Sequence, residues 1–205
     1  MNFTRKEERL LNVSLFLFFA WGVVWAWPER SARGFGFYEI SLTAQNAVFC
    51  LVILLRRTER ELSPSAIGQF LALAAFFSGL VFLRFIGEES GPAADLGRIL
   101  MIAANVLAVG ALLNLGRSFG ILIAIRRLKT RALYGIVRHP MYLSDITLRL
   151  GYCLIYPSAG VFGLAVLSVA LYAARAAWEE KFLSQLEDYR LYCQKVRWRF
   201  IPFVY

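Results

Sequence analysis

The sequence predicts an all-α membrane protein, a polytopic bundle of transmembrane helices. Hydrophobic residues make up 59% of the 205 residues and charged residues only 18%, whereas soluble domains average about 45–50% and about 25%. The apolar residues also form long blocks, and a block of about 18 or more is long enough to cross a bilayer. Soluble globular, disordered and collagen-like classes are therefore excluded.

Apolar segments suggest about six spans, with the last two forming a helical hairpin. The segments are Leu10–Trp27, Phe37–Leu55, Ala66–Ile86, Ile99–Leu115, Met141–Tyr156 and Ala159–Trp178. Pro157 and Ser158 predict the tight turn of the hairpin. The fifth segment is the weakest span, because it is short and contains Asp145 and Arg149. These two lie one helical turn apart, so mutual neutralisation inside the span is the simplest interpretation.

The first segment follows Arg5, Lys6 and Arg9 and could be a secretory signal. It is longer than the apolar region of a signal, rich in aromatic residues and not followed by a clear cleavage site. We therefore interpret it as a transmembrane helix.

The net charge of +9 would suggest nucleic acid in a soluble protein. Here the basic residues gather between apolar segments, in residues 56–60 and 117–138 and after the last span. The positive-inside rule then predicts a multi-pass protein with both termini in the cytoplasm. Anionic lipid head groups are the expected partners of these charges, and nucleic acid is not.

The chain divides into residues 1–115, mainly spans with short loops, and residues 116–205, which include two long basic stretches. The stretches 116–140 and 179–205 contain aromatic residues, so we expect them to be ordered and functional. Three cysteines without a CxxC pair predict neither a disulfide framework nor a metal site. Cys50 and Cys153 are expected to be small buried hydrophobes.

Two motifs lie before the fifth segment. Gly116-Arg-Ser-Phe-Gly120 indicates a turn with positive φ or a close backbone approach, and a plain helix-stop loop is the alternative. In the second motif, Pro140 suits the first turn of a helix. The single histidine, His139, lies beside Arg138 and at that helix N-terminus, so we expect a neutral imidazole that forms hydrogen bonds. The alternative is a histidine that caps or packs, and a metal site lacks ligands.

Two further clusters follow the sixth segment. Arg175 and Glu179 are four residues apart and share a helical face. An exposed ion pair is one interpretation, but two adjacent acids, Glu179 and Glu180, are costly at the bilayer edge unless they face a polar cavity. Tyr189 and Tyr192 also share a face, and an interfacial helix would explain them without any catalysis.

These features form one ordered series along the chain: G-x-S-F, Lys129-Thr130, Tyr134, Arg-His-Pro-Met-Tyr, the hairpin, Arg175 with Glu179-Glu180, the paired tyrosines and Arg-Phe-Ile-Pro. In order and spacing, the series resembles the isoprenylcysteine carboxyl methyltransferase family. The resemblance covers Gly116 to Pro202 and makes residues 116–205 a methyltransferase core. It implies S-adenosyl-L-methionine as methyl donor, bound in a cytoplasmic pocket. The residues implied for that pocket are Leu128, Lys129, Tyr134, His139, Pro140, Met141, Tyr142, Glu179 and Glu180.

The resemblance further implies that Arg175 holds the carboxylate of the acceptor, and that Arg175 and Glu179 are the catalytic residues. The acceptor would be hydrophobic or lipid-anchored and would enter from the bilayer. Two positions depart from the family. Ala132 stands where the family commonly has glycine, and the segment between Glu180 and Tyr189 is slightly short for closing the pocket.

Elementary chemistry favours a carboxylate acceptor. Methyl transfer from a sulfonium needs alignment and water exclusion but no metal. A carboxylate is already ionised at pH 7 and needs a cation but no base, whereas an amine would need a base. A phospholipid N-methyltransferase remains the nearest alternative, followed by a non-catalytic membrane scaffold. A membrane reductase is disfavoured because the chain has no dinucleotide fingerprint. The sequence names neither the acceptor nor an oligomeric state.

Overall fold

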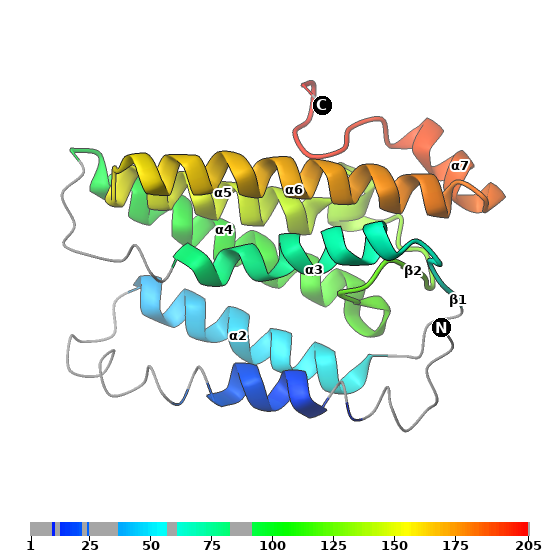
Figure 1. The fold of residues 1–205 in the computed structure, drawn as a ribbon, viewed down its shortest axis with the longest axis horizontal. Coiled ribbons are helices and arrows are strands. Elements are labelled where there is room, and N and C mark those ends of the chain that lie inside the picture. Colours follow the sequence, from blue (N-terminus) through cyan, green and yellow to red (C-terminus); the bar gives the residue numbers. More distant parts are fainter. Residues whose placement is uncertain are drawn as a thin grey trace.

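A computed structural model describes residues 10, 13–21, 24, 37–56, 61–82 and 92–204. Parts of the first predicted span, the end of the third and the basic residues Arg5, Lys6 and Arg9 lie outside the described residues. The helices are α2 (Phe37–Leu55), α3 (Ala66–Val81), α4 (Ala94–Leu115), α5 (Pro140–Ile155), α6 (Ala159–Leu183) and α7 (Glu187–Lys195), and residues 13–21 are also helical. The long helices lie side by side, with α7 at one end (Figure 1). The mainly helical class is confirmed.

Two described helices are long and apolar enough to cross a membrane, Ala94–Ser118 and Ala159–Leu183. The apolar helices Thr43–Leu55 and Ala66–Gly79 are shorter, so six spans remain a prediction.

Two helices extend beyond the apolar segments that predicted them. α4 begins at Ala94 rather than Ile99, and α6 continues past Trp178 to Leu183. Backbone hydrogen bonding continues through polar residues that hydropathy excludes.

The predicted helical hairpin joins α5 and α6 through residues 156–158. Pro140 occupies the first turn of α5, as expected. Ser158 caps α6, because its Oγ accepts a hydrogen bond from the Val161 backbone N–H at 3.2 Å. Such a cap satisfies one of the four N–H groups left free at a helix start. The turn is therefore encoded locally.

Helices α4 and α5 approach closely at a pair of glycines. A Cβ on Gly151 would lie 2.5 Å from Met101 Cγ and 2.8 Å from the Gly97 carbonyl oxygen. Small residues at such a contact let two backbones pack directly, which is typical of helix pairs in membranes. This contact fixes the depth at which α5 lies in the bundle.

A short antiparallel ladder, which the sequence analysis did not predict, joins β1 (Glu61–Leu62) to β2 (Ala124–Ile125). The side-chain amide of Gln69 on α3 reinforces it. Gln69 Nε2 donates to the carbonyl oxygens of Ser63 and Ile123 at 3.1 and 2.9 Å, and its Oε1 accepts from Ile123 N–H at 3.0 Å. Two residues per strand are too few for alternation to be visible in a sequence. The ladder and the amide attach the 116–140 loop to α3.

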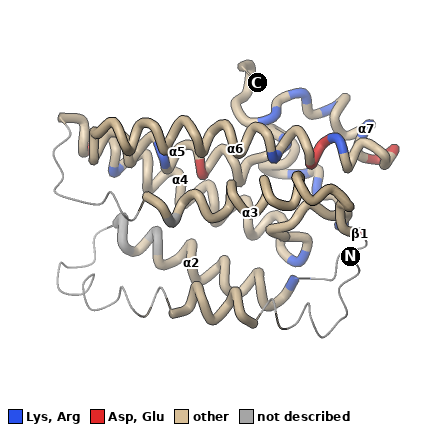
Figure 2. Tube along the Cα trace, in the orientation of Figure 1, with Lys and Arg blue, Asp and Glu red and all other residues tan. Residues whose placement is uncertain are grey.

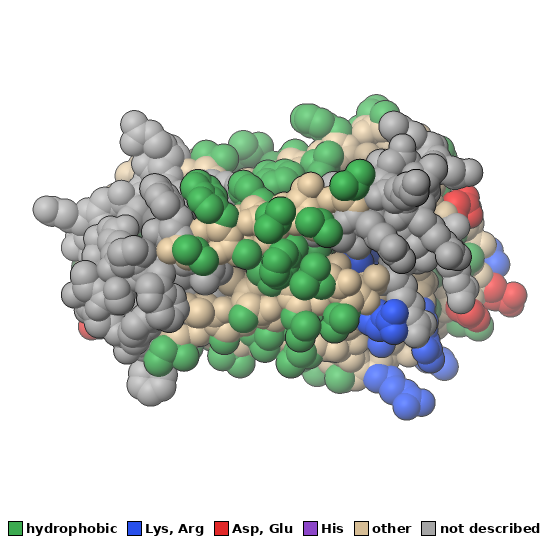
Figure 3. Space-filling model, turned by 90° about the horizontal axis from the view of Figure 1, so that it is seen from below, with side chains coloured by type: hydrophobic (Ala, Val, Ile, Leu, Met, Phe, Trp, Pro, Cys, Tyr) green, Lys and Arg blue, Asp and Glu red, His purple; other side chains and the backbone are tan. Residues whose placement is uncertain are grey.

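Charge and hydrophobicity are distributed along the bundle axis. The Lys and Arg residues of the described chain are most numerous at the end that contains β1 and α7 (Figure 2). Hydrophobic side chains cover the middle of the face in Figure 3. Large apolar side chains such as Phe70 and Val166 are about 70% exposed, which suits a lipid-facing surface. Cys50 and Cys153 are buried as expected.

The 116–140 loop contains two backbones with positive φ. Gly116 has φ +50°, which confirms the expectation of a glycine turn after α4. Ala132, which begins the 3₁₀ turn η3 (Ala132–Gly135), has φ +52°. A Cβ in this left-handed region costs about 1–2 kcal/mol. Ala132, which stands where the resembled family commonly has glycine, is therefore a strained position.

Ala132→Gly is expected to increase the free energy of unfolding by about 0.5–1 kcal/mol, because glycine relieves the strain but gains entropy in the unfolded chain. Thermal unfolding in detergent measures the change. Ala170→Gly, on the exposed side of α6, is the matched control and should destabilise by about 0.5–1 kcal/mol. Equal destabilisation by both substitutions would contradict the assignment of backbone strain to Ala132.

Candidate active site

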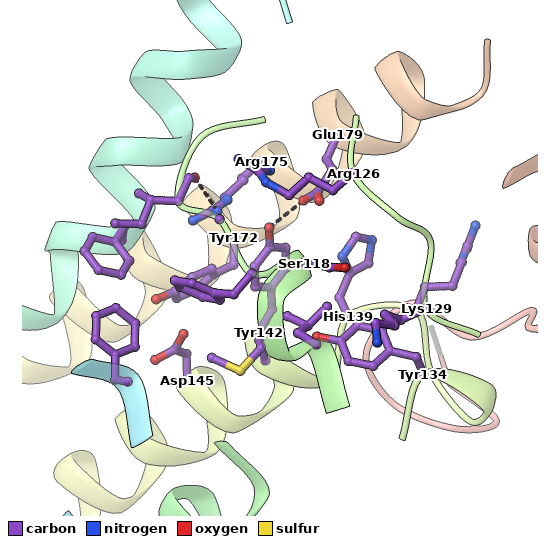
Figure 4. A pocket seen from close by; sticks show the side chains of 18 of the residues that line it. Ser118, Arg126, Lys129, Tyr134, His139, Tyr142, Asp145, Tyr172, Arg175 and Glu179 are labelled. Carbon is purple, nitrogen blue, oxygen red and sulfur yellow. Dashed lines mark hydrogen bonds between the residues drawn. The ribbon is translucent and has the colours of Figure 1, made fainter. Parts of the chain in front are cut away.

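A cavity of about 440 Å³ is lined by residues of helices α2 to α7, of the helical segment 13–21 and of the 116–140 loop (Figure 4). This volume is within the range of small-molecule sites. The predicted site residues that line it are Leu128, Lys129, Tyr134, His139, Met141, Tyr142, Arg175 and Glu179. Pro140, which is buried at the start of α5, and Glu180 do not line it.

Glu179 and Arg175 face the cavity together with Tyr142. The Tyr142 hydroxyl donates to Glu179 Oε2 at 2.6 Å, and Arg175 Cζ lies 5.1 Å from the centre of the Tyr142 ring, a cation–π distance. Arg175 Nη1 and Nη2 donate to the carbonyl oxygens of Ala72 and Ile121 at 3.1 and 2.6 Å. Arg175 is only 6% exposed, so the exposed ion pair considered above is wrong.

His139 connects the cavity to a buried carboxylate. Its Nε2 lies 3.0 Å from Glu180 Oε1, and its ring stacks on Tyr142 with centroids 4.9 Å apart and planes 6° apart. Nε2 carries a proton, since a carboxylate oxygen can only accept. His139 is the N-cap residue of α5 but its side chain forms no capping hydrogen bond, so side-chain capping is wrong, whereas the packing part of that alternative is confirmed by the stacked, buried ring.

Glu180 binds cationic groups from two other segments. Its carboxylate lies 3.4 Å from Arg138 Nη1 and accepts from Arg199 Nε at 2.9 Å, besides its contact with His139. The backbone follows the same path, because Arg138 N–H donates to the Trp198 carbonyl oxygen at 2.9 Å. Glu180 therefore contacts two cavity-lining residues, His139 and Arg138, from behind, and it attaches the C-terminal tail to the start of α5.

The two tyrosines of α7 point inward and line the cavity. Their ring centres are 5.8 Å apart, and the Tyr192 hydroxyl donates to the Tyr134 carbonyl oxygen at 2.6 Å. Burial raises the pKa of Tyr134, Tyr189 and Tyr192, so their hydroxyls remain donors at neutral pH. The short segment before Tyr189 does not prevent the tail from closing this end of the cavity.

Sequence analysis did not assign several polar residues of the cavity wall to the site, among them Ser118, Arg126, Arg138 and Tyr172. Tyr172 precedes Arg175 by three residues, so helical spacing could have placed it on the same face. Arg126 donates to the Leu122 carbonyl oxygen at 3.0 Å, and its guanidinium occupies the space that a side chain on Gly120 would fill. No local pattern indicates that contact.

The other part of the cavity is aromatic. Its phenylalanines are Phe18, Phe19, Phe49, Phe76, Phe77, Phe82 and Phe119. Asp145 and Arg149 also line the wall, and Arg149 Nη1 lies 3.3 Å from Asp145 Oδ1. The expected mutual neutralisation of this pair is confirmed. One cavity thus joins a charged region near the loop to an aromatic region between the helices.

Glu180→Gln is expected to lower the free energy of unfolding by about 3 kcal/mol, because it leaves the guanidinium groups of Arg138 and Arg199 without their carboxylate in a mostly buried site. Chemical denaturation measures the change. Glu187→Gln, an exposed position on α7, is the matched control and should shift stability by less than about 0.5 kcal/mol. Similar values for both variants would mean that Glu180 does not hold the tail.

The sequence is similar to known methyltransferases. Residues 94–188, from the start of α4 into α7, match the phospholipid methyltransferase family. Protein-S-isoprenylcysteine O-methyltransferase B of Arabidopsis thaliana is 29% identical over 144 residues, which cover 66% of this chain and 69% of that protein. Both similarities support the methyltransferase family that the ordered motifs resemble, and they indicate that the protein is a methyltransferase.

Proposed function

We propose that this protein is an integral-membrane methyltransferase that uses S-adenosyl-L-methionine to methylate the carboxylate of a hydrophobic or lipid-anchored acceptor. The observation that carries the proposal is the continuous cavity. Arg175 and Glu179 lie in it between the charged loop region and the aromatic region. Donor and acceptor would meet at these two residues, the donor from the cytosol and the acceptor from the bilayer.

The charged region suits the donor. S-adenosyl-L-methionine supplies a methyl group on a sulfonium, and the electron pair of the broken C–S bond remains on sulfur as the methyl passes to a nucleophile. Glu179 offers a carboxylate to the cationic groups of such a donor, and Tyr142 holds one of its oxygens in place. Lys129 and Arg126 offer cations for a donor carboxylate.

The acceptor carboxylate is assigned to Arg175. Two guanidinium nitrogens already donate to backbone carbonyls, and Nε is buried with no hydrogen-bond partner. An arginine has five N–H donors, so several remain for an anion. The backbone contacts hold the fork rigidly, which favours an aligned attack on the methyl carbon. One carboxylate oxygen forms the new O–CH₃ bond, and no proton has to be removed.

The surroundings of the site would keep water out during transfer. The α7 tyrosines and the tail held by Glu180 cover the loop side, and the phenylalanines cover the bundle side. Exclusion of water strengthens the charge interactions inside. The basic end of the bundle would face the cytoplasm, as the positive-inside rule predicts, with the apolar helices in the bilayer.

Calorimetry with S-adenosylhomocysteine on the protein in detergent, followed by methyl-transfer assays, tests the proposal. Saturable binding and methyl ester formation on lipophilic carboxylates are expected. Absence of binding would reject a methyl-donor site here. Binding together with methylation of phosphatidylethanolamine, and not of carboxylates, would instead establish the phospholipid N-methyltransferase alternative.

Glu179→Gln is expected to weaken S-adenosylhomocysteine or donor binding by about tenfold, equivalent to about 1.4 kcal/mol, because the amide removes the negative charge while it preserves shape. Titration calorimetry with the sulfonium donor measures the effect. Glu187→Gln is again the control, since it changes the same charge outside the cavity. Unchanged donor affinity in Glu179→Gln would place the donor elsewhere.

Arg175→Lys is expected to lower kcat/KM for the acceptor by about tenfold or more, because lysine cannot offer a bidentate pair of donors to a carboxylate. Donor affinity should stay within a few-fold of the native value. The two readouts are steady-state kinetics with the acceptor varied and calorimetry with S-adenosylhomocysteine. If the loss appears in donor affinity instead, Arg175 belongs to the donor site.

A further inference from the structure

Two charged residues interrupt the aromatic part of the cavity, which is where the apolar body of the acceptor would lie. Tyr142, Asp145 and Arg149 follow one another at spacings of three and four on α5, so they share a face. At 1.5 Å per residue, Arg149 lies about 10 Å further along the helix than Tyr142. The acceptor body would therefore pass Asp145 first and Arg149 next.

The guanidinium of Arg149 occupies a niche formed by three helices. A Cβ on Gly79 of α3 would lie 2.7 Å from Arg149 Nη2, so a side chain there would displace the guanidinium. Arg149 Cζ lies 5.3 Å from the ring centre of Phe82 and 5.7 Å from that of Tyr172. The residue is 4% exposed. The neighbours hold the guanidinium in one place.

The hydrogen-bonding capacity of this guanidinium is largely unused. Nη1 donates to the backbone oxygen and to Oδ1 of Asp145, both at 3.3 Å, and Nη2 donates to the Tyr172 hydroxyl at 3.5 Å. These distances are at or beyond the long limit of N–H···O bonds, which centre near 2.9 Å. Nε is buried without a partner. Buried donors left this way are costly.

Asp145 gives the pair access to the cavity. Its side chain is 29% exposed and points into the cavity on the side of Tyr172 (Figure 4). The two charges cancel, so the pair presents both a donor and an acceptor but no net charge. A ligand group with a second full charge at this depth would be desolvated without a counter-ion.

We infer that the acceptor carries a second polar group, a neutral oxygen such as a hydroxyl or carbonyl, partway along its apolar body. This oxygen accepts from Arg149, and a hydroxyl also donates to Asp145. A purely hydrocarbon body would cover the pair and provide no hydrogen bond in return. The inference rests on the proposed function and narrows its substrate class to oxygenated lipophilic acids.

A series of acids of one length tests the inference. Tetradecanoic acid is compared with analogues that carry one hydroxyl or one keto oxygen at successive carbons. We expect kcat/KM to peak at one oxygen position, at about tenfold or more above the plain acid. A plain acid that is methylated as well as every oxygenated analogue would overturn the inference and leave the proposed function intact. If no acid is methylated although S-adenosylhomocysteine binds, the carboxylate acceptor itself is rejected.

Two variants assign the preference to this pair. Asp145→Leu with Arg149→Met replaces the ion pair by apolar groups, a change that proteins often tolerate. It should abolish the preference for the oxygenated acid and preserve S-adenosylhomocysteine affinity. The matched control replaces Asp95 and Arg98, an exposed acid–arginine pair on α4, in the same way and should keep the preference.

Asp145→Asn gives a readout that a merely structural role would not produce. It leaves the Arg149 charge uncompensated, so the preferred acceptor should change from the hydroxy acid to a dicarboxylic acid with its second carboxylate near the same position. A preference unchanged in both this variant and the double variant would show that the pair does not contact the acceptor.

Discussion

The site depends on one buried carboxylate. Glu180 holds His139 and Arg138 before α5 and Arg199 in the tail, and it belongs to the end of α6. Three segments that are distant in the chain therefore meet at two oxygen atoms. Because His139 stacks on Tyr142, the same carboxylate also sets the orientation of a ring in the cavity wall. A single residue behind the site thus determines the shape of its charged region.

The cavity wall has charged residues at two depths. Near the loop, Glu179 and Arg175 flank Tyr142, and deeper in the bundle Asp145 and Arg149 flank Tyr172. In both places a tyrosine contacts an arginine, and an acidic residue, Glu179 or Asp145, lies beside them. This repetition arises because α5 and α6 run antiparallel in the hairpin. Residues three and four apart on each helix share a face, and that face is directed toward the other helix. We interpret the upper group as the place of methyl transfer and the deeper one as a determinant of acceptor choice.

The 116–140 loop is ordered by contacts at both ends. Gly116 allows the turn after α4, and the Gln69 amide binds the strand that follows it. The Tyr134 carbonyl accepts from Tyr192, so the tail covers the other end. The left-handed Ala132 between them is a local cost that the surrounding contacts sustain. A loop held in this way can present Arg126 and Lys129 to a ligand without first ordering itself.

Sequence alone predicted the helical class, the hairpin and the resemblance to a methyltransferase family, because apolar blocks, Pro157-Ser158 and an ordered series of motifs are local properties of the chain. It also indicated that Arg175, Glu179 and His139 have special surroundings. Only the tertiary structure decided that Glu180 lies behind His139, that Arg175 bonds to the Ala72 carbonyl, and that the loop pairs with β1. Each of these contacts joins residues far apart in the chain, and hydrogen bonds and ion pairs of that kind arise only when packing brings distant helices together.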